Sequence, residues 1–268
     1  MATVPSQLDY LAHLSRESAR FAAAIADAPP AAPVPSCPDW TADDLLWHLA
    51  EVQWFWGTIV REGVDGEAAE AMKPPRPGER AALAQFFDHA SRDLAAALAA
   101  APPDTAAWTW SDDHTVGFIR RRQAHEALIH RLDAELTADC RTVMDQALSA
   151  DGVDEALRVM FDGAPPEWGA ITLEPGRTVR ITATDAGTSW HVNLGRFTGT
   201  SPRGQSYDEP ALAVADVDPG TPVGAAVAGS AADLDAWLWG RPPLGSMERS
   251  GDPATLSGFD AVIATGID

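Results

Sequence analysis

The first half of the chain contains stretches in which apolar residues recur every three or four positions. The clearest stripe consists of Leu45, Leu49, Val52, Trp56 and Ile59. This period places the apolar side chains on one side of an α-helix. The same pattern predicts helices over residues 5–28, 79–100 and 116–136. Four helices of this length, joined by loops, predict a four-helix bundle.

Capping and breaking residues indicate where these elements begin and end. Thr41 is expected to be the N-cap of the second helix, with Asp44 three residues later completing a short capping box. Pro-rich and Gly-rich stretches at residues 31–39 and 64–79 are expected to be loops.

In the second half the apolar period shortens to two, which is typical of strands. Strands are expected over residues 178–184 and 190–194, and around Leu212 and Val214. Ser230, with Asp233 three positions later, is expected to cap a final helix that contains Leu234, Trp237 and Leu238. We therefore predict an α+β protein with a helical bundle at residues 1–150 and a small α+β domain at residues 151–268. The linker is expected within residues 138–165.

The composition narrows the range of functions. Asp and Glu outnumber Lys and Arg by 39 to 19, which gives a formal net charge of −20. Such a charge repels phosphate backbones and anionic lipids, so nucleic-acid and peripheral membrane binding are disfavoured. No apolar run approaches the length of a membrane span, and the N-terminus lacks the pattern of a signal peptide. With only Cys37 and Cys140, no disulfide framework is expected, and a cytoplasmic location is predicted.

The fourth predicted helix carries the strongest chemical signal. Glu126 and His130 are four residues apart, so they differ by about 40° around the helix axis and can converge on one point. His48, at the border of the apolar stripe of the second helix, can face the same point. Two imidazoles and a carboxylate would form a metal site with an open coordination position, which is the catalytic kind.

Other interpretations remain open at this stage. Gln123, Glu126, His130 and Asp133 could together form a solvated helix face, and His48 could be a packed core histidine. His125 is expected to pack or to hydrogen-bond, with His89 as a further alternative ligand.

Cys37 comes just before a helix, where the pKa of a thiol can fall. We nevertheless expect it to be a packed structural cysteine. Trp47, Trp54 and Trp56 crowd the His48 helix and could wall a pocket. The chain has no phosphate-binding glycine loop, no G-x-S-x-G and no C-x-x-C motif.

Three segments together resemble the mycothiol-dependent maleylpyruvate isomerase family. Residues 36–49 resemble its start, and residues 122–135 resemble its metal-binding helix. Residues 229–252, with Trp237-Leu238-Trp239-Gly240-Arg241, resemble its small C-terminal domain. The resemblance covers nearly the whole chain and implies a DinB-like N-terminal bundle.

The resemblance also implies a site and its cofactors. It implies a divalent metal, usually zinc, bound by His48, Glu126 and His130, and mycothiol as the thiol cosubstrate. Arg241 corresponds to an arginine of the family that contributes to activity. The presence of one lysine, Lys73, among 19 basic residues agrees with an actinobacterial source.

We therefore expect an enzyme in which a metal-bound thiolate attacks a small electrophilic substrate, as a cis–trans isomerase or a thiol S-transferase. A metal-dependent hydrolase on the same bundle and a non-enzymatic small-molecule-binding protein remain alternatives, because one fold hosts many functions. The sequence identifies neither the electrophile nor the oligomeric state.

Overall fold

The chain forms two compact units. The computed structural model describes residues 8–163, 165–218 and 220–267. The first unit extends from Leu8 to Met144, and the second begins at Asp145. Residues 145–150, which the sequence analysis assigned to the first domain, belong to the second unit, because helix α6 (Gln146–Glu155) starts there and continues past residue 150. None of the described helices is both long and apolar enough to cross a membrane.

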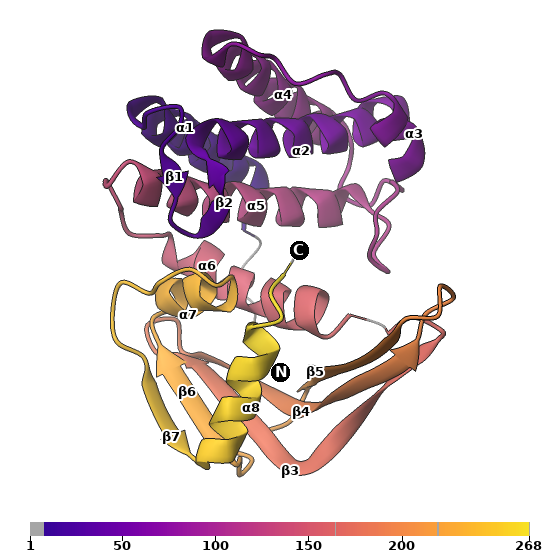
Figure 1. Cartoon of the computed structure of the whole chain (residues 1–268), viewed down its shortest axis with the longest axis vertical. Coiled ribbons are helices and arrows are strands. Elements are labelled where there is room, and N and C mark those ends of the chain that lie inside the picture. Colours follow the sequence, from indigo (N-terminus) through magenta and orange to yellow (C-terminus); the bar gives the residue numbers. More distant parts are fainter. Residues whose placement is uncertain (1–7, 164, 219, 268) are drawn as a thin grey trace. The chain divides into compact units, whose positions relative to one another are not determined.

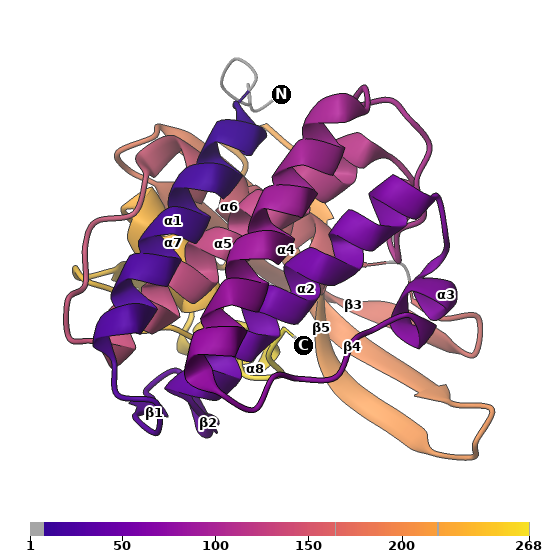
Figure 2. The same cartoon turned by 90° about the horizontal axis from the view of Figure 1, so that it is seen from above.

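The first unit is the predicted four-helix bundle (Figure 1). Its long helices are α1 (Tyr10–Asp27), α2 (Ala42–Glu62), α4 (Arg80–Ala100) and α5 (Val116–Thr137). Helix α1 packs against α4 and α5, and α2 packs against α4 and α5. Figure 2, seen from above, shows α1, α4 and α2 side by side. The bundle core is apolar and includes Leu45, Leu49, Phe87, Leu94 and Leu128, all nearly inaccessible to solvent.

The predicted helix boundaries agree closely with the structure. Thr41 Oγ1 accepts a hydrogen bond from the Asp44 backbone N–H, and Asp44 Oδ2 accepts one from the Thr41 backbone N–H at 2.9 Å. This confirms the capping box at the start of α2. Helix α1 begins at Tyr10, with Asp9 as its N-cap. The expected helical residues 5–7 lie outside the described part of the chain.

Two segments expected to be loops contain short regular elements. Strands β1 (Pro33–Val34) and β2 (Cys37–Thr41) form an antiparallel hairpin. The hairpin forms because Val34, fully buried, fixes it to the bundle core, a tertiary contact that a Pro-rich sequence does not reveal. Helix α3 (Gly66–Ala71) lies within the second expected loop and is capped by Asp65, whose side chain accepts from the Ala68 backbone N–H.

The second unit is a five-stranded sheet with helices, which confirms the α+β class. The strand order is β5 (Ser206–Ala215), β4 (Thr188–Thr200), β3 (Gly169–Ala183), β6 (Ala225–Gly229) and β7 (Glu248–Gly251). All neighbours are antiparallel except β3 and β6. The π-helical turn η1 (Ala156–Phe161) extends α6. Alternating residues such as Val179, Ile181 and Val192 face a core that also contains Leu234 and Phe259.

The end of this unit differs from the prediction. Helix α7 (Ala231–Leu238) has the predicted Ser230 cap, but it is not the final helix. Strand β7 and helix α8 (Pro253–Ile263) follow it. All four residues of β7 are exposed, so this edge strand has no apolar alternation from which it could have been predicted. Helix α8 begins with an Asp252 cap followed by Pro253, a start signal that the sequence analysis missed.

Candidate metal centre

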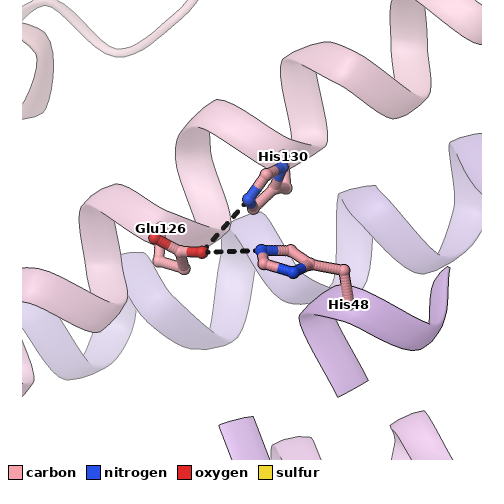
Figure 3. A group of neighbouring side chains, drawn as sticks. All are labelled: His48, Glu126 and His130. Carbon is pink, nitrogen blue, oxygen red and sulfur yellow. Dashed lines mark hydrogen bonds and ion pairs between the residues drawn. The ribbon is translucent and has the colours of Figure 1, made fainter. Parts of the chain in front are cut away.

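Helices α2 and α5 bring His48, Glu126 and His130 together (Figure 3). Nε2 of His48 lies 3.3 Å from Oε1 of Glu126, and Nε2 of His130 lies 3.1 Å from the same oxygen. One donor atom from each residue lies within 4.8 Å of the others. The three side chains that the sequence proposed as ligands are therefore adjacent in the structure.

Local helix geometry accounts for this convergence. Glu126 and His130 are one turn apart on α5, so their side chains point to the same side. On α2, His48 stands between Leu45 and Leu49, which are both fully buried in the bundle. Packing of these leucines fixes the rotation of α2 and leaves the His48 side chain, 29% exposed, at the edge of the core beside α5.

Charges around the carboxylate favour its ionised form. Burial alone would raise the pKa of Glu126, but the positive charge of His130, hydrogen bonds from both histidines and the Arg122 guanidinium hold it well below the usual range. Nη2 of Arg122 lies 2.9 Å from Oε2, the second carboxylate oxygen. Glu126 thus presents an anionic Oε1 between the two imidazoles.

His130 is held from its other side. Its Nδ1 lies 2.9 Å from Oδ2 of the fully buried Asp133, and Ser36 Oγ donates to Oδ1 of the same carboxylate at 2.5 Å. Burial alone would lower the pKa of His130, but the charge of Glu126 and the hydrogen bond to Asp133 raise it to about 9. The Trp40 ring neighbours both histidines: its centroid lies 4.7 Å from that of His48, with the planes inclined by 45°, and 6.2 Å from that of His130, with the planes inclined by 30°.

The donor set fits a divalent cation such as zinc. Ligand atoms about 2.0–2.1 Å from a tetrahedral zinc lie about 3.3 Å from one another. The separations of 3.3 and 3.1 Å between the imidazole nitrogens and the Glu126 oxygen match that value. A ligating histidine commonly donates its remaining ring N–H to a carboxylate, as the position of Asp133 allows for His130.

The solvated-face interpretation of α5 does not describe the structure. Gln123 and Asp133 are almost completely buried, and His130 is 7% exposed. His125 is buried and packs edge-on against Tyr10, in agreement with the expected packing role. His89 is exposed on α4.

Among the described residues, the tryptophan ring that contacts His48 does not come from α2. Trp47 packs against Phe86, and Trp56 stacks against Trp108. The aromatic neighbour of His48 is instead Trp40, which sequence reasoning did not assign to the site. Its signal was its place in the motif of residues 36–41, which carried the family resemblance.

The remaining candidates are Arg241 and the two cysteines. Arg241 follows Gly240, which has a φ of +75°, in the second unit. Its guanidinium donates to the Trp239 carbonyl at 2.5 Å, and its backbone N–H donates to the Ala236 carbonyl. Cys37 packs beside the bundle core, as expected for a structural cysteine, and Cys140 is exposed.

Comparisons with known proteins give consistent results for both units. Residues 11–135 match the family described as the mycothiol maleylpyruvate isomerase N-terminal domain. Residues 147–258 match the MDMPI (mycothiol-dependent maleylpyruvate isomerase) C-terminal domain. A comparison with curated proteins finds no match.

Two solved structures share the fold. A crystal structure of mycothiol-dependent maleylpyruvate isomerase aligns with 14% identity and a TM-score of 0.59. A mutant of that isomerase with one histidine replaced by alanine aligns with 12% identity and a TM-score of 0.57. Each alignment covers 91% of this chain and 93% of the other.

Proposed function

Since the chain belongs to the mycothiol-dependent maleylpyruvate isomerase family, we propose that it is a divalent-metal-dependent enzyme that uses mycothiol to attack a small electrophilic substrate. The observation that supports this most strongly is the convergence of His48, Glu126 and His130 from two helices, with a carboxylate oxygen 3.1 and 3.3 Å from two imidazole nitrogens. We propose these three residues as the metal ligands.

The three ligands would leave a coordination position for the cosubstrate, because structural zinc sites use four protein ligands and catalytic sites use three. A divalent cation bound there would lower the pKa of the mycothiol thiol, and the thiolate is the nucleophilic form of sulfur. Glu126 contributes the negative charge of the donor set, and Arg122 fixes the carboxylate by its second oxygen.

The proposed reaction begins with addition of the mycothiol sulfur to an electrophilic carbon of the substrate. In an isomerisation, addition turns a carbon–carbon double bond into a single bond, rotation follows, and loss of the thiol restores the double bond. In an S-transfer, the carbon–sulfur bond persists, and the carbanion left by the addition takes up a proton, which balances the one that the thiol lost on ionisation. Neither route requires a cysteine of the protein. Maleylpyruvate is the first substrate to test, because the family is named for it.

Arg241 is proposed to bind a carboxylate of the substrate. A guanidinium matches a carboxylate with two parallel hydrogen bonds. A cationic group would also offset the repulsion that a chain of net charge −20 exerts on an anionic substrate.

The test combines metal analysis with turnover of the purified protein. Zinc content and conversion of maleylpyruvate would be measured with and without mycothiol, for wild type and for Glu126→Gln. Glu62→Gln is the matched control, since Glu62 is an exposed carboxylate at the far end of α2 that pairs with Arg61. We expect about one zinc per chain and mycothiol-dependent turnover in wild type and Glu62→Gln. Glu126→Gln should lose both the bound zinc and the turnover.

Mass spectrometry of the products separates the two reactions. Conversion without an adduct indicates an isomerase, whereas a stable mycothiol adduct formed from a panel of electrophiles indicates a transferase. Turnover that does not need a thiol would instead support a hydrolase and contradict the proposal. Protein that retains no metal and catalyses nothing would support the small-molecule-binding alternative.

A further inference from the structure

The β1–β2 hairpin contacts helix α5 beside the candidate metal centre. Ser36, in the turn between the two strands, donates its hydroxyl to Oδ1 of Asp133 at 2.5 Å. The other oxygen of Asp133 lies 2.9 Å from Nδ1 of His130. These contacts form a continuous chain from the hairpin to the imidazole whose Nε2 faces Glu126.

The burial of this chain makes its hydrogen bonds strong and directional. The Asp133 side chain has no exposed surface, and that of His130 is 9% exposed. Hydrogen bonds to an ionised carboxylate are about twice as strong as neutral ones, and exclusion of water strengthens them further. Because the Asp133 carboxylate accepts at Nδ1, a neutral His130 ring would keep its proton on Nδ1 and offer its lone pair at Nε2, so binding of a cation there requires loss of the Nε2 proton.

The same hairpin also reaches the second histidine. Trp40, in strand β2, has its ring centroid 4.7 Å from that of His48 and 6.2 Å from that of His130. The hairpin itself is fixed to the bundle, because Val34 is fully buried in the core and Ala42 donates its backbone N–H to the Ala32 carbonyl at 2.8 Å.

We infer that the β1–β2 hairpin is a positioning element of the metal centre, in which Ser36 and Asp133 form a relay that orients His130. This inference rests on the proposed function, since it concerns a ligand of the proposed metal. Ser36 and Asp133 are positioning residues, because they act through His130. Ser36 and Trp40 of the motif at residues 36–41 thus contact the histidines of the centre, Ser36 through Asp133 and Trp40 directly.

A purely structural role for the relay makes a different prediction. If Ser36 and Asp133 only tied the hairpin to α5, their loss would lower thermal stability and leave the intrinsic metal affinity of the folded protein unchanged. A positioning role requires a loss of metal affinity and a changed coordination environment. The absorption spectrum of bound Co²⁺ reports that environment directly, because its d–d bands depend on ligand geometry.

The experiment compares the variants Ser36→Ala, Ser36→Thr and Asp133→Asn with wild type, using the full chain. Zn²⁺ affinity is measured by competition with a chromophoric chelator, the Co²⁺ spectrum is recorded, and circular dichroism checks folding. Asp88→Asn is the charge-matched control, since Asp88 is an exposed carboxylate on α4 paired with Arg92. Asparagine at position 133 can still accept from Nδ1 but lacks the charge.

We expect Asp133→Asn to weaken Zn²⁺ binding by about 10–100-fold, the range usual for partners of ligating histidines. Ser36→Ala should weaken it by a smaller factor, on the order of threefold to tenfold, because Ser36 acts one step further from the ligand. Both should change the Co²⁺ spectrum. Ser36→Thr, which keeps the hydroxyl, should restore affinity and spectrum, and Asp88→Asn should match wild type.

The outcomes separate this inference from the proposed function. If wild type binds Zn²⁺ while Ser36→Ala and Asp133→Asn bind it equally well with unchanged Co²⁺ spectra, the relay is overturned and the proposed function stands. Wild type that binds neither ion would overturn both. If Asp133→Asn does not fold, the comparison of Ser36→Ala with Ser36→Thr tests the relay. Equal losses in Ser36→Ala and Ser36→Thr would show that the hydroxyl is not the cause.

Discussion

Nη2 of Arg122 lies 2.9 Å from Oε2 of Glu126, while Oε1 of the same carboxylate faces both histidines. Both residues are on α5 and are one turn apart, and the Arg122 side chain is only 4% exposed. The guanidinium therefore supplies both charge and orientation to the one anionic group of the proposed ligand set. This relationship can be tested independently of catalysis.

We predict that Arg122→Met destabilises the metal-free protein, because it takes one of two cationic partners, Arg122 and His130, from a largely buried carboxylate. The effect should be on the order of 1–3 kcal/mol. It should shrink when Glu126→Gln is present, because the neutral amide needs no cation. Chemical unfolding of the two single variants and the double variant measures this coupling. Additive effects would show that Arg122 stabilises the fold through other contacts.

Buried ion pairs fix the helix that carries two of the proposed ligands. Arg131, fully buried on α5, donates to Glu17 of α1 at 2.9 Å and to Glu135 at 2.8 Å. Arg131→Met would leave two buried carboxylates without this partner, so we predict a loss of about 3–5 kcal/mol in the free energy of unfolding.

The matched control for Arg131→Met is Arg92→Met. Arg92 pairs with Asp88 at 2.6 Å on the surface of α4, where both side chains are mostly exposed. Because water screens such pairs, the expected cost is below about 1 kcal/mol. Similar costs for the two substitutions in an unfolding titration would contradict the structural role assigned to Arg131.

The capping box of α2 predicts a specific pH dependence. Hydrogen bonds from the side chain and backbone of Thr41, together with Arg76, lower the pKa of Asp44 from 3.8 to about 2. Because the folded-state pKa is lowered, the contribution of Asp44 to stability is fully present above pH 3.8 and is lost as the pH falls toward 2. Asp44→Asn removes this titration.

The free energy of unfolding would be measured between pH 6 and 2 for wild type and Asp44→Asn. The difference in this free energy between wild type and Asp44→Asn should narrow as the pH falls toward 2. At neutral pH, loss of the Thr41 side-chain cap in Thr41→Ala should cost about 1 kcal/mol. If the free energies of unfolding of wild type and Asp44→Asn differ by a constant amount down to pH 2, the lowered pKa of Asp44 is not the source of its contribution to stability.

Close packing in the second unit gives a prediction for a glycine. A Cβ atom added at Gly152 of α6 would lie 2.7 Å from both carboxylate oxygens of Asp235 on α7. These contacts are shorter than van der Waals distances, so Gly152→Ala must displace Asp235 or α7. We expect a loss of about 1–3 kcal/mol.

Gly78→Ala is the control, because a Cβ atom there would meet no atom within 4 Å. It should leave the unfolding transition of the full chain nearly unchanged or raise its midpoint slightly. If Gly152→Ala is as stable as Gly78→Ala, helix α7 can shift at little cost.

The apolar periods and the capping residues predicted most of the elements of the bundle. The α2 stripe with Leu45 and Leu49, the Thr41 cap and the Glu126–His130 spacing are local features, so the sequence alone determined them. Helices α3 and α8 were missed although Asp65 and Asp252 cap them, whereas two other missed elements had no local signal. The β1–β2 hairpin depends on burial of Val34, and β7 is an exposed edge strand.

The sequence determined which side chains could act as metal ligands, because helical spacing places Glu126 and His130 on one side of α5. It did not determine their surroundings. That His48 lies beside Glu126, that Asp133 is buried against His130, and that Ser36 and Trp40 reach the site from a hairpin were decided by packing of segments far apart in the chain. A one-dimensional pattern encodes the direction of a side chain within its own helix, whereas its neighbours across the bundle depend on how whole elements pack.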